Sequence, residues 1–128
     1  MKVLLSVLTL FAMPMIGCAS TPPAASAPTT AAREPVVLVD GAKARELMDA
    51  GARLVDVRTP DEFAEKHLDG AENVPLDRIY EQDMGPKDKP IIVYCMKGGR
   101  ARLAANNLHD RGYRKVYNLG RMDHWDKQ

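Results

Sequence analysis

The sequence predicts an α/β fold: a small, mainly parallel sheet of five strands with helices on both faces. First, short β-branched and apolar runs alternate with helical patterns from residue 35 onward, as in proteins built from βα units. Second, residues 91–94 read Ile-Ile-Val-Tyr, and such an uncharged run is typical of a strand that is covered on both faces. Third, a chain of 128 residues has room for one domain.

The strands are expected where short runs with β-forming character are bounded by turn residues. Because a helical pattern separates most of these runs, neighbouring strands are expected to be parallel. The expected strands are residues 36–39, 54–57, 71–74, 91–94 and 115–119.

The second helix has the clearest start signal. Thr59 and Glu62 have the spacing of a capping box, and Pro60 occupies the first helical position. A short helix is therefore expected to begin here and run through residues 63–67, before the turn at residues 69–70.

Apolar periodicity and turn residues indicate the remaining elements. Residues 41–50 follow a capping aspartate, and residues 101–111 place small apolar side chains on one helical face. A brief helical turn is expected over residues 75–80 and a terminal turn or short helix over residues 120–125. The polar stretch 83–89 contains glycine and proline, so it is expected to be a loop.

The N-terminus has the pattern of a cleaved targeting signal. The apolar run over residues 3–16 is shorter than the ~20 residues needed to span a bilayer. It ends in Met-Ile-Gly-Cys, which resembles a bacterial lipobox, so residues 1–17 are expected to be a signal peptide and Cys18 the lipidated residue. The alternative is ordinary cleavage near Ala27, which would leave a soluble periplasmic protein.

A tether is expected between the lipid and the folded domain. Residues 18–34 are rich in Ala, Pro, Ser and Thr and have no large apolar residue after the cysteine, so they cannot offset the entropy cost of ordering. The domain is then expected over residues 35–128. The expected location is periplasmic and lipid-anchored, with the outer membrane favoured because alanine rather than aspartate follows Cys18.

Charge and cysteine content narrow the function classes. The net charge is +1, from 18 basic and 17 acidic residues, so the sequence does not predict a nucleic-acid-binding surface. If Cys18 is lipidated, Cys95 is the only thiol of the mature protein. A lone thiol in an oxidising compartment is exposed to damage unless it has a function.

The loop after the central strand is the candidate active site. A buried strand that ends on Cys95 would bring its sulfur to the sheet edge where α/β proteins bind ligands. Two glycines let successive N–H groups curl around one point, and the next helix aims its positive end there. Together with two basic side chains, these features would favour the thiolate and hold an anion beside it. The expected substrate-binding residues are Met96, Lys97, Gly98, Gly99 and Arg100.

For several residues the sequence allows more than one role. Asp56 and Arg58 either take part in catalysis or, as we favour, brace the loop structurally. His67, His109 and His124 are scattered along the chain, so neither a metal site nor a cofactor is expected. Cys95 could also be a free cysteine that ends a core strand for packing alone.

A set of short motifs extends over residues 35–125: Leu-Val-Asp-Val-Arg at 54–58, Glu-Phe at 62–63, His-Leu-Asp-Gly-Ala at 67–71, Asn-Val-Pro at 73–75, Tyr-Cys at 94–95 with the Gly-Arg loop, and Gly-Tyr at 112–113. In order and spacing these motifs resemble the rhodanese domain. The sequence looks most similar to the single-domain periplasmic sulfurtransferases of the phage-shock protein E type. It departs from the family pattern at Lys66 and Arg121, where glycine is common.

The resemblance implies a thiosulfate sulfurtransferase. In such an enzyme Cys95 would take sulfane sulfur from thiosulfate or a similar anionic donor as a persulfide, and would pass it to cyanide or a thiol. A monomer without a nucleic-acid partner is expected, with the membrane contacted through the N-terminal lipid.

Two rival function classes share this architecture. Phosphatases and arsenate reductases resemble a Cys-x5-Arg loop, whereas the loop from Cys95 to Arg100 is one residue shorter, which favours sulfur transfer. A non-enzymatic tethered binding module would be expected to lack the cysteine.

Overall fold

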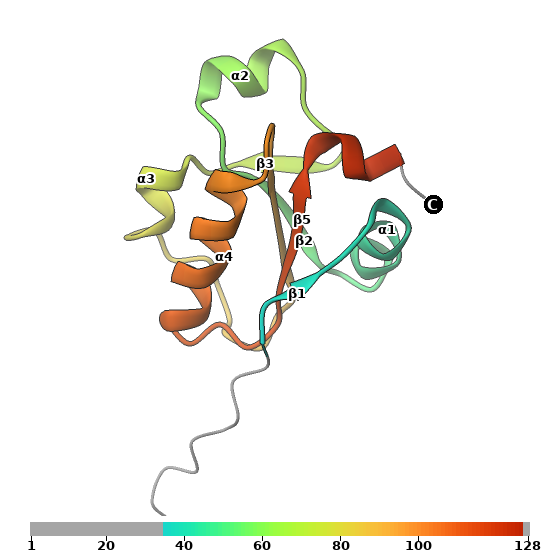
Figure 1. Cartoon of the computed structure of the whole chain (residues 1–128). Helices are drawn as coiled ribbons and strands as arrows, with labels where there is room; N and C mark the ends of the chain where they lie inside the picture. The colour runs from blue at the N-terminus through green and yellow to red at the C-terminus, as the bar shows by residue number, and fades with distance from the viewer. Residues whose placement is uncertain (1–34, 127–128) are drawn as a thin grey trace, which may run out of the picture.

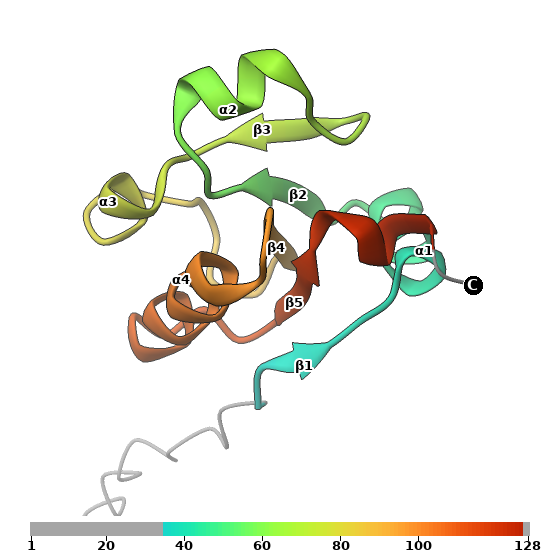
Figure 2. The same ribbon diagram turned by 45° about the horizontal axis from the view of Figure 1, so that its top comes forward.

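The computed structural model describes residues 35–126, which form one parallel five-stranded sheet between two layers of helices (Figure 1). The strand order is β1-β5-β4-β2-β3, visible in Figure 2, and every neighbouring pair is parallel. The predicted fold class is confirmed. The strands are β1 (Val37–Leu38), β2 (Arg53–Asp56), β3 (Ala71–Asn73), β4 (Ile91–Cys95) and β5 (Val116–Arg121).

Helices cover both faces of this sheet. The helices α3 and α4 lie on one face, and α1 and the 3₁₀ helix η1 lie on the other (Figure 1). Within residues 35–126 no helix has the length and apolar character to cross a bilayer. The helices are α1 (Gly41–Asp49), α2 (Pro60–Glu65), α3 (Leu76–Ile79), α4 (Gly99–Asp110) and η1 (Met122–Asp126).

The predictions for the leader concern residues outside this region. The signal peptide over residues 1–17, lipidated Cys18 and the tether up to residue 34 all lie outside the described residues. They stay predictions.

The central strand β4 is buried on both faces, as its apolar sequence indicates. Ile91, Val93 and Cys95 belong to the core cluster beneath α4. Ile92 and Tyr94 point the opposite way, into the cluster beneath α1. This alternation follows from the two-residue repeat of a strand, and it places the cysteine sulfur on the α4 side at the carboxyl end of the sheet.

The capping box at the start of α2 forms as predicted. Thr59 accepts a hydrogen bond from the Glu62 N–H, and the Glu62 side chain accepts one from the Thr59 N–H. The helix begins at Pro60 and ends at Glu65, so the prediction that it runs through residues 63–67 was wrong at its end. Lys66 is extended, with φ at −162°, and its carbonyl accepts a hydrogen bond from the Arg58 guanidinium.

The last strand continues further than residues 115–119. Val93 pairs with Asn118 but Tyr94 pairs with Gly120, so a bulge places one extra residue in β5. Past this bulge the strand runs on, and Cys95 pairs with Arg121. The bulge therefore brings Arg121 beside the start of the cysteine loop.

A close approach fixes η1 against α1. A Cβ atom on Gly41 would lie only 1.9 Å from the Trp125 carbonyl oxygen, so this position has no room for a side chain. Both terminal nitrogens of Arg45 donate hydrogen bonds of 2.9 Å to the same carbonyl. The 3₁₀ helix η1 is thereby held beside the carboxyl edge of the sheet.

Candidate active site

The Cys95 sulfur lies at the floor of a small hollow at the carboxyl end of β4. The side chain is only 1% exposed, and the hollow has a volume of about 420 Å³. A small ion fits such a space. The other lining residues are Glu62, Met96, Lys97, Gly99 and Arg100.

The loop backbone donates a hydrogen bond to this sulfur. The Gly98 N–H donates to Cys95 Sγ over 3.0 Å. Gly98 is the N-cap of α4 and has φ at 90°, a left-handed conformation that glycine adopts without strain. No side chain caps α4. Its first N–H groups therefore remain available to an anion at the positive end of the helix. Gly98 lies in the loop as predicted, whereas Gly99, which was predicted as a loop residue, is the first residue of α4.

Arg100 lies in the first turn of α4 because this helix starts at Gly99, two residues earlier than predicted. Its two terminal nitrogens donate to the Glu62 carboxylate over 2.6 and 2.8 Å. These bonds, together with those from Thr59, lower the pKa of Glu62 to about 2. The positive charge of Arg100 is therefore balanced by a carboxylate from α2, a partner that the sequence analysis missed.

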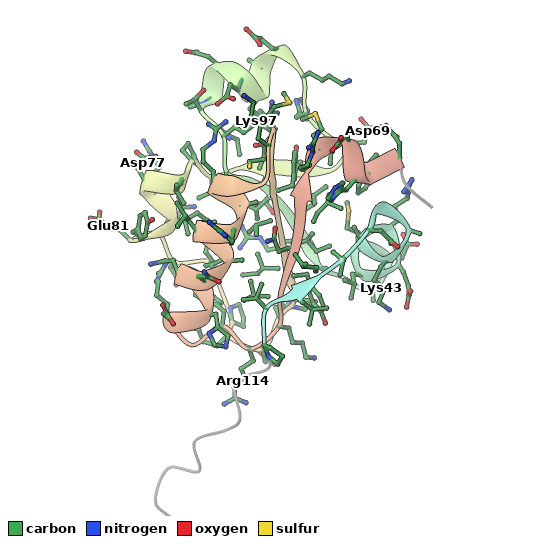
Figure 3. The ribbon with its side chains drawn as sticks, in the orientation of Figure 1. Lys43, Asp69, Asp77, Glu81, Lys97 and Arg114 are labelled. Carbon is green, nitrogen blue, oxygen red and sulfur yellow. The ribbon has the colours of Figure 1, made fainter. Side chains whose placement is uncertain are left out.

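Lys97 is the cation of the loop whose charge is available to a ligand. It is exposed, lines the hollow and lies at the tip of the loop in Figure 3. Among residues 35–126 its ammonium group has no hydrogen-bond or ion-pair partner. An anion that enters the hollow therefore meets an uncompensated positive charge at the entrance.

Asp56 and Arg58 form a fully buried ion pair beside the loop. Their side chains are 0% and 1% exposed, and Arg58 Nη2 lies 2.6 Å from Asp56 Oδ2. Arg58 also binds the Lys66 carbonyl, and Asn73 donates to the Asp56 and Arg58 carbonyls over 3.2 and 3.0 Å. The pair thus holds the segment after β2 in place. That segment carries Glu62, which accepts two hydrogen bonds from Arg100 at the start of α4.

The histidines have structural contacts. His67 stacks on Phe63 with ring centroids 3.9 Å apart, and the ring of His124 contacts the Leu119 carbonyl over 2.9 Å. In the part of the chain that the structure describes, no three His, Cys, Asp or Glu side chains gather as metal ligands.

Sequence comparison decides the family. The rhodanese-like domain family matches residues 40–128. The chain belongs to this family. The rhodanese-like domain of this chain is 35% identical over 103 residues to thiosulfate sulfurtransferase 18 of Arabidopsis thaliana, covering 68% of this chain and 75% of that protein. It is 33% identical over 88 residues to thiosulfate sulfurtransferase GlpE of Pseudomonas aeruginosa, covering 65% and 77%.

Two further relatives differ in how much of their own length the match covers. The uncharacterized protein YqhL of Bacillus subtilis is 39% identical over 69 residues, and the match spans 53% of this chain and 55% of YqhL. The human single-domain sulfurtransferase TSTD1 has the same fold, with a TM-score of 0.63 at 24% identity over 73% of this chain and 97% of that chain.

Acid is expected to weaken the link between α2 and the cysteine loop. The pKa of Glu62 lies at about 2, below its ordinary value of 4.5. Its charge therefore stabilises the fold fully above pH 4.5, and this contribution is lost as the pH falls toward 2. Glu62→Gln, which cannot titrate, should lose less free energy of unfolding than wild type between pH 5 and pH 2.

The comparison requires urea unfolding of both proteins at several pH values. The Arg100 and Glu62 side chains are 37% and 32% exposed, so solvent screens their interaction. The loss of unfolding free energy between pH 5 and pH 2 is therefore expected to differ between wild type and Glu62→Gln by no more than about 1 kcal/mol. If the free energy of unfolding changed with pH in the same way in both proteins, the low pKa assigned to Glu62 would be contradicted.

Proposed function

We propose that this protein is a sulfurtransferase that moves sulfane sulfur from thiosulfate to cyanide or a thiol through a persulfide on Cys95. The observation that carries the proposal is the placement of one thiol at the floor of an anion-sized hollow. The Gly98 N–H and the uncapped start of α4 converge there. Relatives named thiosulfate sulfurtransferases, at 31% to 35% identity, support it.

The first half-reaction uses the donors that the loop provides. The Cys95 thiolate attacks the outer sulfur of thiosulfate, the S–S bond of thiosulfate breaks, and its electron pair leaves with sulfite. The loop N–H groups and Lys97 stabilise the dianion as it enters and the sulfite as it departs. The outer sulfur remains on Cys95 as a persulfide, which the same N–H groups can hold.

The geometry favours sulfur transfer over phosphate or arsenate chemistry. The loop from Cys95 to Arg100 is one residue shorter than a Cys-x5-Arg loop. The guanidinium of Arg100, which would be expected to clamp an oxyanion, is turned to Glu62 by two hydrogen bonds. A third possibility, a catalytically inactive binding module, is disfavoured because the thiol and the Gly98 N–H that donates to it are both in place.

A direct assay separates these classes. The purified domain is incubated with thiosulfate and cyanide, and the thiocyanate formed is measured. In parallel, p-nitrophenyl phosphate hydrolysis is measured under the same conditions. Thiocyanate formation without phosphate ester hydrolysis is expected, and the reverse pattern would assign the loop to phosphatase chemistry.

Lys97→Ala is expected to weaken capture of the donor. The loss of a charge-assisted contact should raise KM for thiosulfate by roughly tenfold. Because the Arg100 charge is balanced by Glu62, Arg100 offers little compensation. Steady-state kinetics with thiosulfate and with mercaptopyruvate should show the larger loss for the dianion, and the gap should shrink at high salt.

Lys115→Ala is the matched control, because Lys115 is also exposed and lies before β5, at the opposite end of the sheet. It should leave KM for thiosulfate close to the wild-type value. Equal losses for both donors in Lys97→Ala would remove Lys97 from donor recognition.

We also propose that the mature protein is anchored to the periplasmic side of a membrane, with the outer membrane favoured, through lipidated Cys18. The lipobox-like sequence that ends at Cys18 supports this proposal. Cys18→Ala should release the protein from the membrane fraction or block its processing. Fractionation and intact mass test it. An unchanged mature mass, with soluble protein in both variants, would instead favour cleavage near Ala27.

A further inference from the structure

A second hollow adjoins the cysteine loop and has one lining residue, Met96, in common with the first. It has a volume of about 480 Å³ and lies between the turn after α2, the loop and η1. Met96, the neighbour of Cys95, lines both hollows and is 43% exposed. The second hollow therefore borders the residue that directly follows the reactive cysteine. Its lining includes Lys66, His67, Asp69, Met96, Arg121 and Trp125.

The second hollow is lined by a positive and a negative side chain that form no ion pair with other described residues. Among residues 35–126, the Lys66 ammonium and the Asp69 carboxylate have no hydrogen-bond or ion-pair partner. By contrast, Arg121 is held by Asp123 through two bonds of 2.9 Å. Lys97 and Asp69 lie at the same end of the molecule in Figure 3, near the carboxyl edge of the sheet. The unused charges thus point to a ligand with both an anionic and a cationic group.

The second hollow is lined in part by residues that differ from the rhodanese pattern. Lys66 and Arg121, the two positions at which the sequence departs from the rhodanese pattern, both line this hollow. Their proximity depends on the extended conformation of Lys66 and on the bulge that carries β5 to Arg121. A hollow of about 480 Å³ is in the range of small-molecule sites, which favours a low-molecular-weight ligand over a protein surface.

We infer that this hollow binds the sulfur acceptor, a small thiol that carries both a carboxylate and an ammonium group. Lys66 would bind the carboxylate, Asp69 would bind the ammonium group, and the thiol would reach Cys95 past Met96. The inference rests on the proposed function, because it concerns the second half of the same reaction.

The transfer step needs no further reactant. The acceptor thiol loses its proton to solvent, and its sulfur attacks the outer sulfur of the Cys95 persulfide. The bond between that outer sulfur and Cys95 Sγ breaks, and its electron pair returns to Sγ as thiolate. The product is the persulfide of the acceptor, and Cys95 is ready for another donor.

The test isolates this step by single turnover. The domain is loaded with thiosulfate, excess donor is removed, and loss of the extra sulfur is followed by intact mass after a thiol is added. Four thiols serve as probes: cysteine carries both charges, cysteamine only the ammonium, 3-mercaptopropionate only the carboxylate, and 2-mercaptoethanol neither. Comparing each variant with wild type for the same thiol cancels the intrinsic reactivity of that thiol.

Asp69→Asn is expected to slow transfer to cysteine and cysteamine by about twofold to fivefold, the usual effect of an exposed ion pair. Lys66→Ala should slow transfer to cysteine and 3-mercaptopropionate by a similar factor. Asp77→Asn is the matched control, because Asp77 is an exposed aspartate on α3, away from the hollow (Figure 3). It should leave the rates with all four thiols unchanged.

The outcomes separate this inference from the function on which it rests. A domain that gains no sulfur from thiosulfate overturns both. A domain that loads normally, but whose Asp69→Asn and Lys66→Ala variants match wild type with every thiol, overturns the acceptor site alone. The second result would instead favour an acceptor that does not enter this hollow, such as a protein thiol.

Discussion

Replacing Cys95 with serine is expected to abolish sulfur transfer while the domain stays folded. The hydroxyl is nearly isosteric with the thiol, and it can still accept the hydrogen bond that the Gly98 N–H donates to Cys95 Sγ over 3.0 Å. A serine oxygen, however, does not attack a sulfane sulfur to form a persulfide-like intermediate. Activity should therefore fall below a few per cent of wild type.

Both parts of this expectation are measurable. Thiocyanate formation from thiosulfate and cyanide gives the activity. Thermal unfolding followed by circular dichroism shows whether the fold persists, and a shift in stability of no more than about 1.5 kcal/mol is expected for a near-isosteric core substitution. A folded variant with substantial turnover would mean that another residue carries the sulfur.

The largest effect on stability is expected for Arg58→Ala. This substitution leaves the Asp56 carboxylate, which is 0% exposed, without its charged partner, and it removes the hydrogen bond to the Lys66 carbonyl. Breaking a buried ion pair from one side typically costs about 3–5 kcal/mol. Urea unfolding should show a loss of this size, and activity should fall as well because the segment that carries Glu62 loosens.

Two comparisons make this prediction specific. Lys43→Ala removes an exposed ion pair with Glu46, with side chains 48% and 70% exposed, and should leave the free energy of unfolding close to the wild-type value. The double variant Asp56→Ala/Arg58→Ala should be less destabilised than the sum of the two single variants, because neither charge is left buried alone. Strict additivity would contradict a direct coupling between the two side chains.

The sequence predicts those parts of this structure that depend on local signals. The run from Ile91 to Tyr94 identified the central strand, because burial on both faces leaves no place for charged residues. Thr59 and Glu62 identified the start of α2 because a capping box lies within one helical turn. The glycines after Cys95 identified the loop, and Gly98 indeed adopts a left-handed conformation that disfavours other residues.

Contacts between distant segments could not be predicted in the same way. Glu62 and Arg100 are 38 residues apart. Because the capping box already explained why a glutamate stands at position 62, the sequence did not point to a second, distant partner for it. Nothing in the sequence around Gly41 indicated that this residue packs against the Trp125 carbonyl. The position of Arg121 beside Cys95 depends on a bulge in β5, and no turn residue or periodicity indicated that bulge. Two residues placed by these contacts, Trp125 and Arg121, line the second hollow.

The most direct test of the proposed chemistry is the intact mass of the purified domain after brief exposure to thiosulfate and removal of the excess. The mass should increase by one sulfur atom, peptide mapping should place that atom on Cys95, and cyanide should remove it. A domain that is folded and holds its Cys95 thiol reduced, but gains no sulfur at any thiosulfate concentration, would contradict the account.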